Sequence, residues 1–253
     1  MIGLYHYIAL GMFTAFALLE LLLVGRKFPP VTHWRLQGTA FTLLYFAVAT
    51  YAPLFWDGWL GEHRLFGADM LPLWAQILGG FLVLELGIYG WHRTMHNTTF
   101  LWRWFHQMHH SPERVDIWGA LYFHPFDSIG WAFLGSLALV LGFGVSAEAA
   151  IVINVIATFY GMFQHLNVRT PHWLGYIIQR PESHSCHHER GVHARNYSDL
   201  PLWDMVFGTF RNGPAVGTPL PRQGFYDGAS ARVWEMLAFR DVSRPAHRRA
   251  TGA

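Results

Sequence analysis

The chain has 253 residues, of which 52% are hydrophobic and only 13% are charged, against about 25% charged residues in an ordinary soluble domain. So few charges could not cover the surface of a free soluble protein of this length, and they exclude a disordered chain and a nucleic-acid binder with a basic face. A single cysteine, Cys186, excludes an internal disulfide framework.

Five apolar stretches have the length, about 20 residues, that an α-helix needs to cross a bilayer. They cover residues 3–25, 36–56, 71–91, 128–147 and 149–168, and each contains at most one Asp, Glu, Lys or Arg. The pattern predicts transmembrane helices in a single membrane-embedded domain, residues 1–253. Very few residues separate the last two stretches, which could form a shallow hairpin, so the sequence allows four or five crossings. The first stretch lacks the basic segment of a cleaved signal peptide, and we expect it to be retained.

The loops between these stretches differ in charge. Segment 26–35 carries three basic residues and no acid, segment 57–70 carries three acids against one arginine, and further arginines follow the third and fifth stretches. Because basic loops stay in the cytoplasm, we expect the amino terminus outside. The cytoplasmic side would then hold a helical cap, residues 92–125 and 169–239, followed by a flexible basic tail, residues 240–253.

Sixteen histidines are present, and most of those in the predicted cap occur at metal-ligand spacing. On a helix, positions i, i+3 and i+4 share a face, so such imidazoles can reach one ion. Eight histidines meet this description: His92, His96, His106, His109, His110, His184, His187 and His188. His165, at the end of the fifth apolar stretch and on the same side, is the ninth candidate. One ion takes four to about six ligands, so nine imidazoles indicate two ions. The ligand type suits iron, zinc, copper or nickel and does not choose between them.

The order of these motifs resembles the fatty acid hydroxylase/sterol desaturase superfamily of integral membrane, histidine-rich di-iron enzymes. The motifs read HRTMH from residue 92, HQMHH from 106, FQHLN from 163 and HSCHH from 184, and NYSDLPLWDMVFGTF from 196 is similar to the family's tail motif. The resemblance covers roughly residues 85–210. Arg169 stands where some members place a further histidine, and Ser198 replaces a usual glycine. A tenth ligand, His193 or His124, therefore stays open.

The resemblance implies an all-α integral membrane protein with four to five transmembrane helices and a cytoplasmic helical cap that encloses a site for two iron ions. Zinc could replace iron during preparation. The implied reaction is O2-dependent hydroxylation or desaturation of an unactivated C–H bond in a lipid, such as a fatty acyl chain or a sterol. No flavin, haem or ferredoxin domain is visible in the sequence, so we expect a separate electron donor: a cytochrome b5-like protein, a ferredoxin or a reductase. The sequence decides neither the reaction outcome nor the lipid.

Carboxylates are the expected supports of such a site, because a metal-bound imidazole needs an acceptor for its other ring nitrogen. The candidates are Glu113, Asp116, Glu182, Glu189, Asp199 and Asp204. Glu85 lies within an apolar stretch, two turns before His92, and could support a ligand or line a substrate channel. His124 is a further candidate near the metals, whereas Asp127 could simply cap the following helix.

Three other classes of function fit parts of the sequence. A membrane metal transporter would place its ligands along a path at mid-membrane depth, whereas these histidines gather at one side. A zinc-dependent membrane hydrolase would need a general base such as the glutamate of H-E-x-x-H, but Arg93 follows His92. A haem-binding electron carrier would pair histidines inside two spans, and only His165 comes close to that arrangement.

Overall fold

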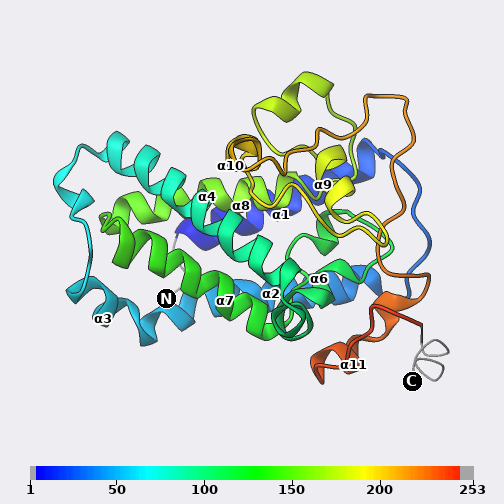
Figure 1. Ribbon diagram of the computed structural model, residues 1–253, viewed down its shortest axis with the longest axis horizontal. Helices are drawn as coiled ribbons and strands as arrows, with labels where there is room; N and C mark the ends of the chain where they lie inside the picture. Colours follow the sequence, from blue (N-terminus) through cyan, green and yellow to red (C-terminus); the bar gives the residue numbers. More distant parts are fainter. Residues whose placement is uncertain (1–3, 246–253) are drawn as a thin grey trace.

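The chain is described here by a computed structural model that covers residues 4–245. Within this range it forms helices and loops and no β-strand, which confirms the all-α fold class. The long helices are α1 (Leu4–Leu22), α2 (Trp34–Tyr51), α4 (Leu73–Asn97), α7 (Pro125–Ser136) and α8 (Ala147–Phe163). They run along the long axis of the molecule, and most of the short helices gather at one end of them (Figure 1).

Short helical segments extend or connect the long ones. Two continue a long helix directly: η1 (Ala52–Phe55) after α2 and the π-helical η5 (Leu137–Gly142) after α7. The others are α3 (Asp57–Glu62), η2 (Ala68–Met70), α5 (Thr99–Leu101), η3 (Trp102–His106), α6 (Gln107–His110), η4 (Ile117–Gly119), η6 (His172–Tyr176), α9 (Pro181–His187), α10 (Pro201–Val206), η7 (Ala229–Ala231) and α11 (Val233–Leu237).

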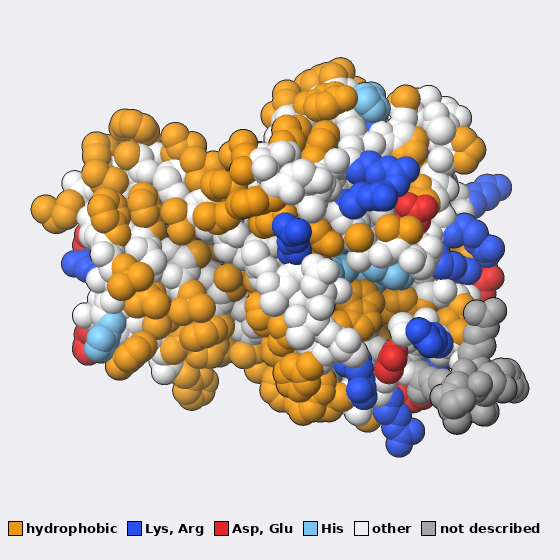
Figure 2. Space-filling view, in the orientation of Figure 1, with side chains coloured by type: hydrophobic (Ala, Val, Ile, Leu, Met, Phe, Trp, Pro, Cys, Tyr) orange, Lys and Arg blue, Asp and Glu red, His pale blue; other side chains and the backbone are white. Residues whose placement is uncertain are grey.

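Four helical stretches in the described part of the chain are long and apolar enough to cross a membrane. They are Leu4–Leu22, Trp34–Phe55, Leu73–Asn97 and Pro125–Gly142. The fifth predicted span contains α8, whose 17 residues extend about 25 Å and fall short of a hydrocarbon core about 30 Å thick. Large apolar side chains cover much of the long-helix end, whereas arginines and acids are denser over the short helices (Figure 2). This division suits a bundle in lipid with a hydrophilic cap.

Small residues bring the long helices close together. α8 packs against α1 and α4, and α2 packs against α7. A Cβ atom at Gly80 of α4 would lie 2.7 Å from Cδ1 of Ile153 on α8, so a larger residue there would force the end of this side chain to move. Such small residues at contact points are typical of helices that pack within a bilayer.

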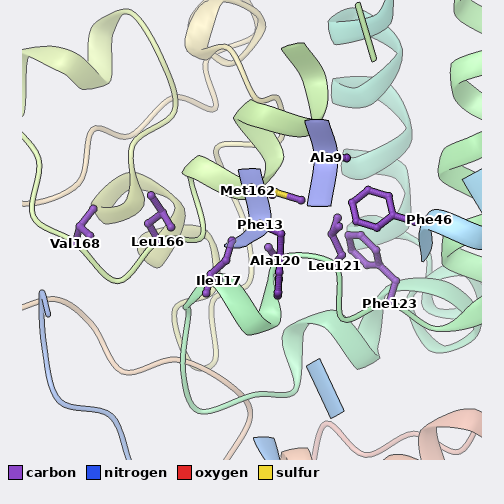
Figure 3. Close-up of a cluster of buried hydrophobic side chains, with 10 residues drawn as sticks. All are labelled: Ala9, Phe13, Phe46, Ile117, Ala120, Leu121, Phe123, Met162, Leu166 and Val168. Carbon is purple, nitrogen blue, oxygen red and sulfur yellow. The ribbon is translucent and has the colours of Figure 1, made fainter. Parts of the chain in front are cut away.

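A buried apolar cluster joins the bundle to the cap. Side chains of α1, α2 and the end of α8 meet the segment 117–123 there (Figure 3). Its members are Ala9, Phe13, Phe46, Ile117, Ala120, Leu121, Phe123, Met162, Leu166 and Val168. The ring of Phe123 also lies 4.6 Å, centroid to centroid, from that of His109. The cluster therefore packs beneath the histidine motifs and holds segment 117–123 in place beside them.

The start of the predicted tail differs from the expectation. Val242 is fully buried, and its N–H donates to Oε1 of Gln107, while Nε2 of Gln107 donates to the carbonyl of Arg240. Residues 240–242 are therefore packed against α6 and not free, because the amide of Gln107 holds their main chain. Residues 246–253 of the predicted tail lie outside the described part of the chain.

Candidate metal centre

Local helix geometry presents the histidines on common faces. α4 continues past residue 91 to Asn97, so His92 and His96 lie one turn apart on the same helix. The next motif begins in the π-helical η3 and ends in α6, and π-helical turns inside helices are frequent at functional sites. Pro181 opens α9 at its first turn, where a proline fits because its missing N–H has no partner within the helix. His165 follows α8 in a turn.

The nine predicted histidines come together in two groups, and in each group the ligand atoms lie within 4.8 Å of one another. The first group contains His92, His96, His106, His110 and His187. The second group contains His109, His165, His184 and His188. Each H-x-x-H-H motif is divided between them, because positions i and i+4 are only about 40° apart around a helix, whereas i+3 is turned about 60° from i in the opposite direction. Neither His193, His124 nor Cys186 belongs to either group.

Hydrogen bonds fix the protonation of the first group. Nδ1 of His92 donates to the carbonyl of Tyr197 at 2.7 Å, and Nδ1 of His106 donates to Oδ2 of Asp127 at 2.8 Å. Since these oxygens accept the proton held on Nδ1, each Nε2 carries a lone pair. The two Nε2 atoms lie 3.0 Å apart. Two lone pairs at this distance repel each other unless a cation lies between them.

His96 and His187 complete the same pattern. Their Nδ1 atoms donate to the carbonyls of His193 at 2.7 Å and Arg195 at 2.6 Å. Nε2 of His187 faces Nε2 of His110 at 3.1 Å. Nε2 of His96 is buried without any hydrogen-bond partner, which is costly for a polar atom. A metal ion would satisfy this orphaned lone pair together with its neighbours, so the first group fits a metal.

The second group has fewer external hydrogen bonds. His165 donates from Nδ1 to the carbonyl of Gly161 at 2.7 Å, and its Nε2 faces those of His109 at 3.1 Å and His184 at 3.0 Å. Nε2 of His188 lies 3.0 Å from that of His184. Nδ1 of His109 and Nδ1 of His184 are buried without partners. This group also turns several ring nitrogens toward one point, but less of it is anchored by the surrounding protein.

Burial keeps these imidazoles neutral. It lowers the pKa of His184 well below the usual 6.5, and the neighbouring His165 and His109 lower it further. Burial also lowers the pKa of His165 to about 4 and that of His110 well below 6.5, with His188 adding to the effect. At neutral pH the rings therefore keep the lone pairs that metal binding requires.

The acceptors for the ring N–H groups are not those that the sequence suggested. Four of the five anchored rings use main-chain carbonyls, and the fifth uses Asp127, which we expected only to cap a helix. The helix cap is instead Nδ1 of His124, which accepts from the N–H of Phe126. The expected acids bind elsewhere: Glu113 accepts from Ser230, Asp116 from Trp34, Glu182 from Thr170, Asp199 from Gln164, and Glu189 faces Arg211.

Glu85 and Asp204 support the site through the main chain. Oε2 of Glu85 accepts from the N–H of Leu200 at 2.9 Å. Asp204 accepts from the N–H groups of Tyr197 and Ser198, both at 2.9 Å. Both acids therefore hold the segment whose Tyr197 carbonyl binds His92. Glu85 is absent from the lining of the cavity described below, so it does not line a channel in the described part of the chain.

The other sequence candidates lie beside the site. The ring of His124 lies 4.9 Å from that of Phe239, outside both groups. Nδ1 of His193 lies 3.2 Å from Nδ1 of His110, so His193 contacts a ring of the first group from behind. Its carbonyl also accepts from His96. His193 thus supports two candidate ligands without offering a tenth ring nitrogen to either group.

A cavity of about 610 Å³ leads from the histidines into the helix bundle. Both groups contribute to its inner end, through His92, His106, His109, His165 and His184. Its walls are mostly apolar, with Leu84, Ile88, Leu121, Leu134 and Ala157 among them, and its far end contains Tyr5, His6, Thr50 and Asp57. The volume falls within the range of about 300–1,000 Å³ that is usual for sites of organic ligands.

Comparison with known proteins identifies the family of this chain. The protein-family model described as "Fatty acid hydroxylase" matches residues 77–209, a range that contains all nine histidines. The chain belongs to the fatty acid hydroxylase family. No solved structure matches it.

Three curated relatives illustrate the family. An ornithine lipid hydroxylase of Rhizobium tropici is 34% identical over 182 residues, which are 70% of this chain and 52% of the relative. A sphinganine C4-monooxygenase of Arabidopsis thaliana is 28% identical over 56% of each chain. The alkylglycerol monooxygenase of Homo sapiens is 31% identical over 59% of this chain and 33% of its own length. The chain thus spans about half the length, or less, of these relatives.

Proposed function

We propose that this chain is a membrane-bound oxidoreductase that uses O2 and two iron ions to hydroxylate or desaturate an unactivated C–H bond of a lipid. One observation carries the proposal: two groups of inward-facing imidazole nitrogens meet at the inner end of a largely apolar cavity within a bundle of membrane-capable helices. The relatives support it, since their names describe hydroxylation or oxygenation of lipids.

The spacing of the ring nitrogens supports a shared ion in each group. Facing Nε2 atoms lie 3.0–3.1 Å apart in both groups, close enough for imidazole nitrogens that bind one ion at about 2.1 Å. Imidazole donors suit iron as well as zinc. Because zinc has no redox chemistry, the proposed use of O2 favours iron.

Bound iron would supply the activation of O2, and the chain's residues would supply its setting. Hydroxylation of R–H consumes O2, two electrons and two protons and yields R–OH and H2O. The carbonyls of residues 193, 195 and 197 keep the Nδ1 protons in place, which leaves each Nε2 free for the metal. Leu84, Ile88 and their apolar neighbours exclude water from the reacting carbon.

The substrate would be an amphiphile that enters from the bilayer. Its hydrocarbon chain would lie along the apolar walls, with the reacting carbon beside His109 and His165 at the inner end of the cavity. We place this end on the cytoplasmic side, following the charges of the loops. Electrons would come from a separate donor protein.

Metal analysis combined with lipid analysis tests the proposal. The purified chain in nanodiscs should bind two iron ions and consume O2 in the presence of its lipid, and cells with and without the chain should differ in one oxidised lipid by mass spectrometry. His109→Ala and His187→Ala should each abolish oxygenation and reduce metal content. His63→Ala is the matched control, because His63 is exposed and belongs to neither group. Full activity in both ligand variants, or metal binding without any lipid product, would contradict the assignment.

A further inference from the structure

One segment, which runs from half-buried His193 to buried Tyr197, holds three histidines of the first group. The carbonyls of His193, Arg195 and Tyr197 accept from Nδ1 of His96, His187 and His92, at 2.6–2.7 Å. Alternate carbonyls of a single stretch thus point inward at three candidate ligands. Because each hydrogen bond continues directly into an imidazole ring, segment 193–197 is a bonded path between the protein surface and the first group.

Arginines surround the outer side of this segment. Arg195 and Arg211 line a cleft of about 310 Å³ together with Gly208, Thr209 and Phe210. Nη1 of Arg195 is buried and has no hydrogen-bond partner. Among the described residues, Arg211 has one ion-pair partner, Glu189, at a loose 3.7 Å. The cleft therefore carries positive charge that the described residues leave largely uncompensated.

Further arginines extend the basic surface. Arg93 is exposed and donates to the hydroxyl of Tyr89, which also accepts from Thr209 at the cleft. Arg190 and Arg222 share a single carboxylate, that of Asp227. Five arginines thus face two carboxylates. A compact group of basic side chains is visible over the cap, with histidine surface close beside it (Figure 2).

We propose that the surface around Arg195 and Arg211 is the docking site of an acidic electron-donor protein, and that electrons pass from it through segment 193–197 to the first histidine group. This inference rests on the proposed function, which requires two electrons per turnover. In each of two steps the donor's redox group loses one electron and the metal centre gains it. An anionic lipid would bind to the positive charge but would have no use for the hydrogen-bonded path to the histidines. A donor protein would bind to the charge and also pass its electrons along segment 193–197.

Binding of a known acidic donor tests the docking site without any lipid substrate. The probe is a plant-type [2Fe–2S] ferredoxin, and its Kd for the metal-loaded chain in neutral-lipid nanodiscs is measured at about 0.15 M and 0.5 M salt. The double variant Arg211→Gln/Arg222→Gln changes two exposed arginines and leaves Arg195, whose carbonyl holds His187, in place. It should raise this Kd about fivefold or more at the lower salt, and the difference should shrink at the higher salt, where charges are screened within a few ångströms. Arg64→Gln is the matched control, because Arg64 is an exposed arginine on the loop between α3 and α4, outside the cleft.

Anaerobic reduction separates docking from metal chemistry. Reduced ferredoxin should reduce the iron of the double variant several-fold more slowly than that of the unaltered chain, while reduced methyl viologen, which needs no docking site, should reduce both at the same rate. Unchanged ferredoxin binding in the double variant, or an equal loss in Arg64→Gln, would overturn the inference. So would a double variant that loses affinity only for anionic-lipid vesicles. Failure of methyl viologen to reduce the unaltered chain would instead count against the proposed function.

Discussion

The two histidine groups are built from the same motifs but are supported differently. In the first group, Nδ1 of every ring has a partner: three carbonyls of segment 193–197, the carboxylate of Asp127 and the ring of His193. In the second group, Nδ1 atoms of two of the four rings are buried without partners. Preorganised ligands bind a metal more tightly. The comparison therefore teaches that the first group is the more rigid half of the centre.

The two groups also face different regions. Three of the four rings in the second group line the cavity, against two of the five in the first. The first group is instead hydrogen-bonded to segment 193–197, which lies beside the arginines. This difference gives the proposed centre a direction, with electrons arriving at the first group and the substrate reaching the second.

Loss of one ligand from each group should have the largest effect. His187→Ala and His184→Ala should each lower the metal content from two ions toward one and reduce the oxidation rate below detection, because both ions act together. Metal analysis and product formation measure this. If the two groups are distinct, the metal that remains should have a different spectrum in the two variants. Identical spectra in the two variants, or two ions retained in both, would show that the two histidine groups are not separate metal sites.

Asp127→Ala should weaken the first group alone. Without the carboxylate, Nδ1 of His106 loses its acceptor, and loss of such a partner usually costs about 10–100-fold in metal affinity. Competition with a chelator of known affinity measures the change. Asp116→Ala is the control, because Asp116 is equally buried but binds Trp34 instead of a histidine. An equal loss of affinity in both variants would show a general effect of unpairing a buried acid.

Partial removal of metal should empty the two groups in sequence. Because fewer of its rings are anchored, the second group should release its ion about tenfold faster in a chelator at neutral pH. The time course, followed by metal analysis, should show two phases of equal amplitude. A single phase would indicate that both ions are held alike.

Glu85→Gln should have the smallest effect. The amide oxygen of glutamine can still accept from the N–H of Leu200, so the segment that holds His92 should stay in place. We expect a change in the free energy of unfolding of less than about 1 kcal/mol and an unchanged metal content. Glu85→Leu, which removes the acceptor, should destabilise the protein more and weaken the first group. Loss of metal in Glu85→Gln would mean that the charge of Glu85 matters directly.

Much of the candidate site could be predicted from the sequence, because side-chain type and spacing carry its chemistry. The spacing of eight histidines predicts that they share helix faces, and the structure brings these eight and His165 into the two groups. The carbonyl acceptors could not be predicted, since every residue has a carbonyl and none carries a sequence signal. The contact of Asp127 with His106 could not be predicted either, because an acid after a proline near the start of a helix also fits a simple cap.

The sequence by itself determined the helical class, the membrane-capable spans and the set of histidines, because apolar length and i, i+3, i+4 spacing are local properties. Only the tertiary structure decided how each H-x-x-H-H motif divides between two groups, which carbonyls hold the rings, and where the arginines lie relative to them. These features depend on contacts between segments about 100 residues apart in the chain, such as that of His92 with Tyr197. No local pattern can encode such a distance.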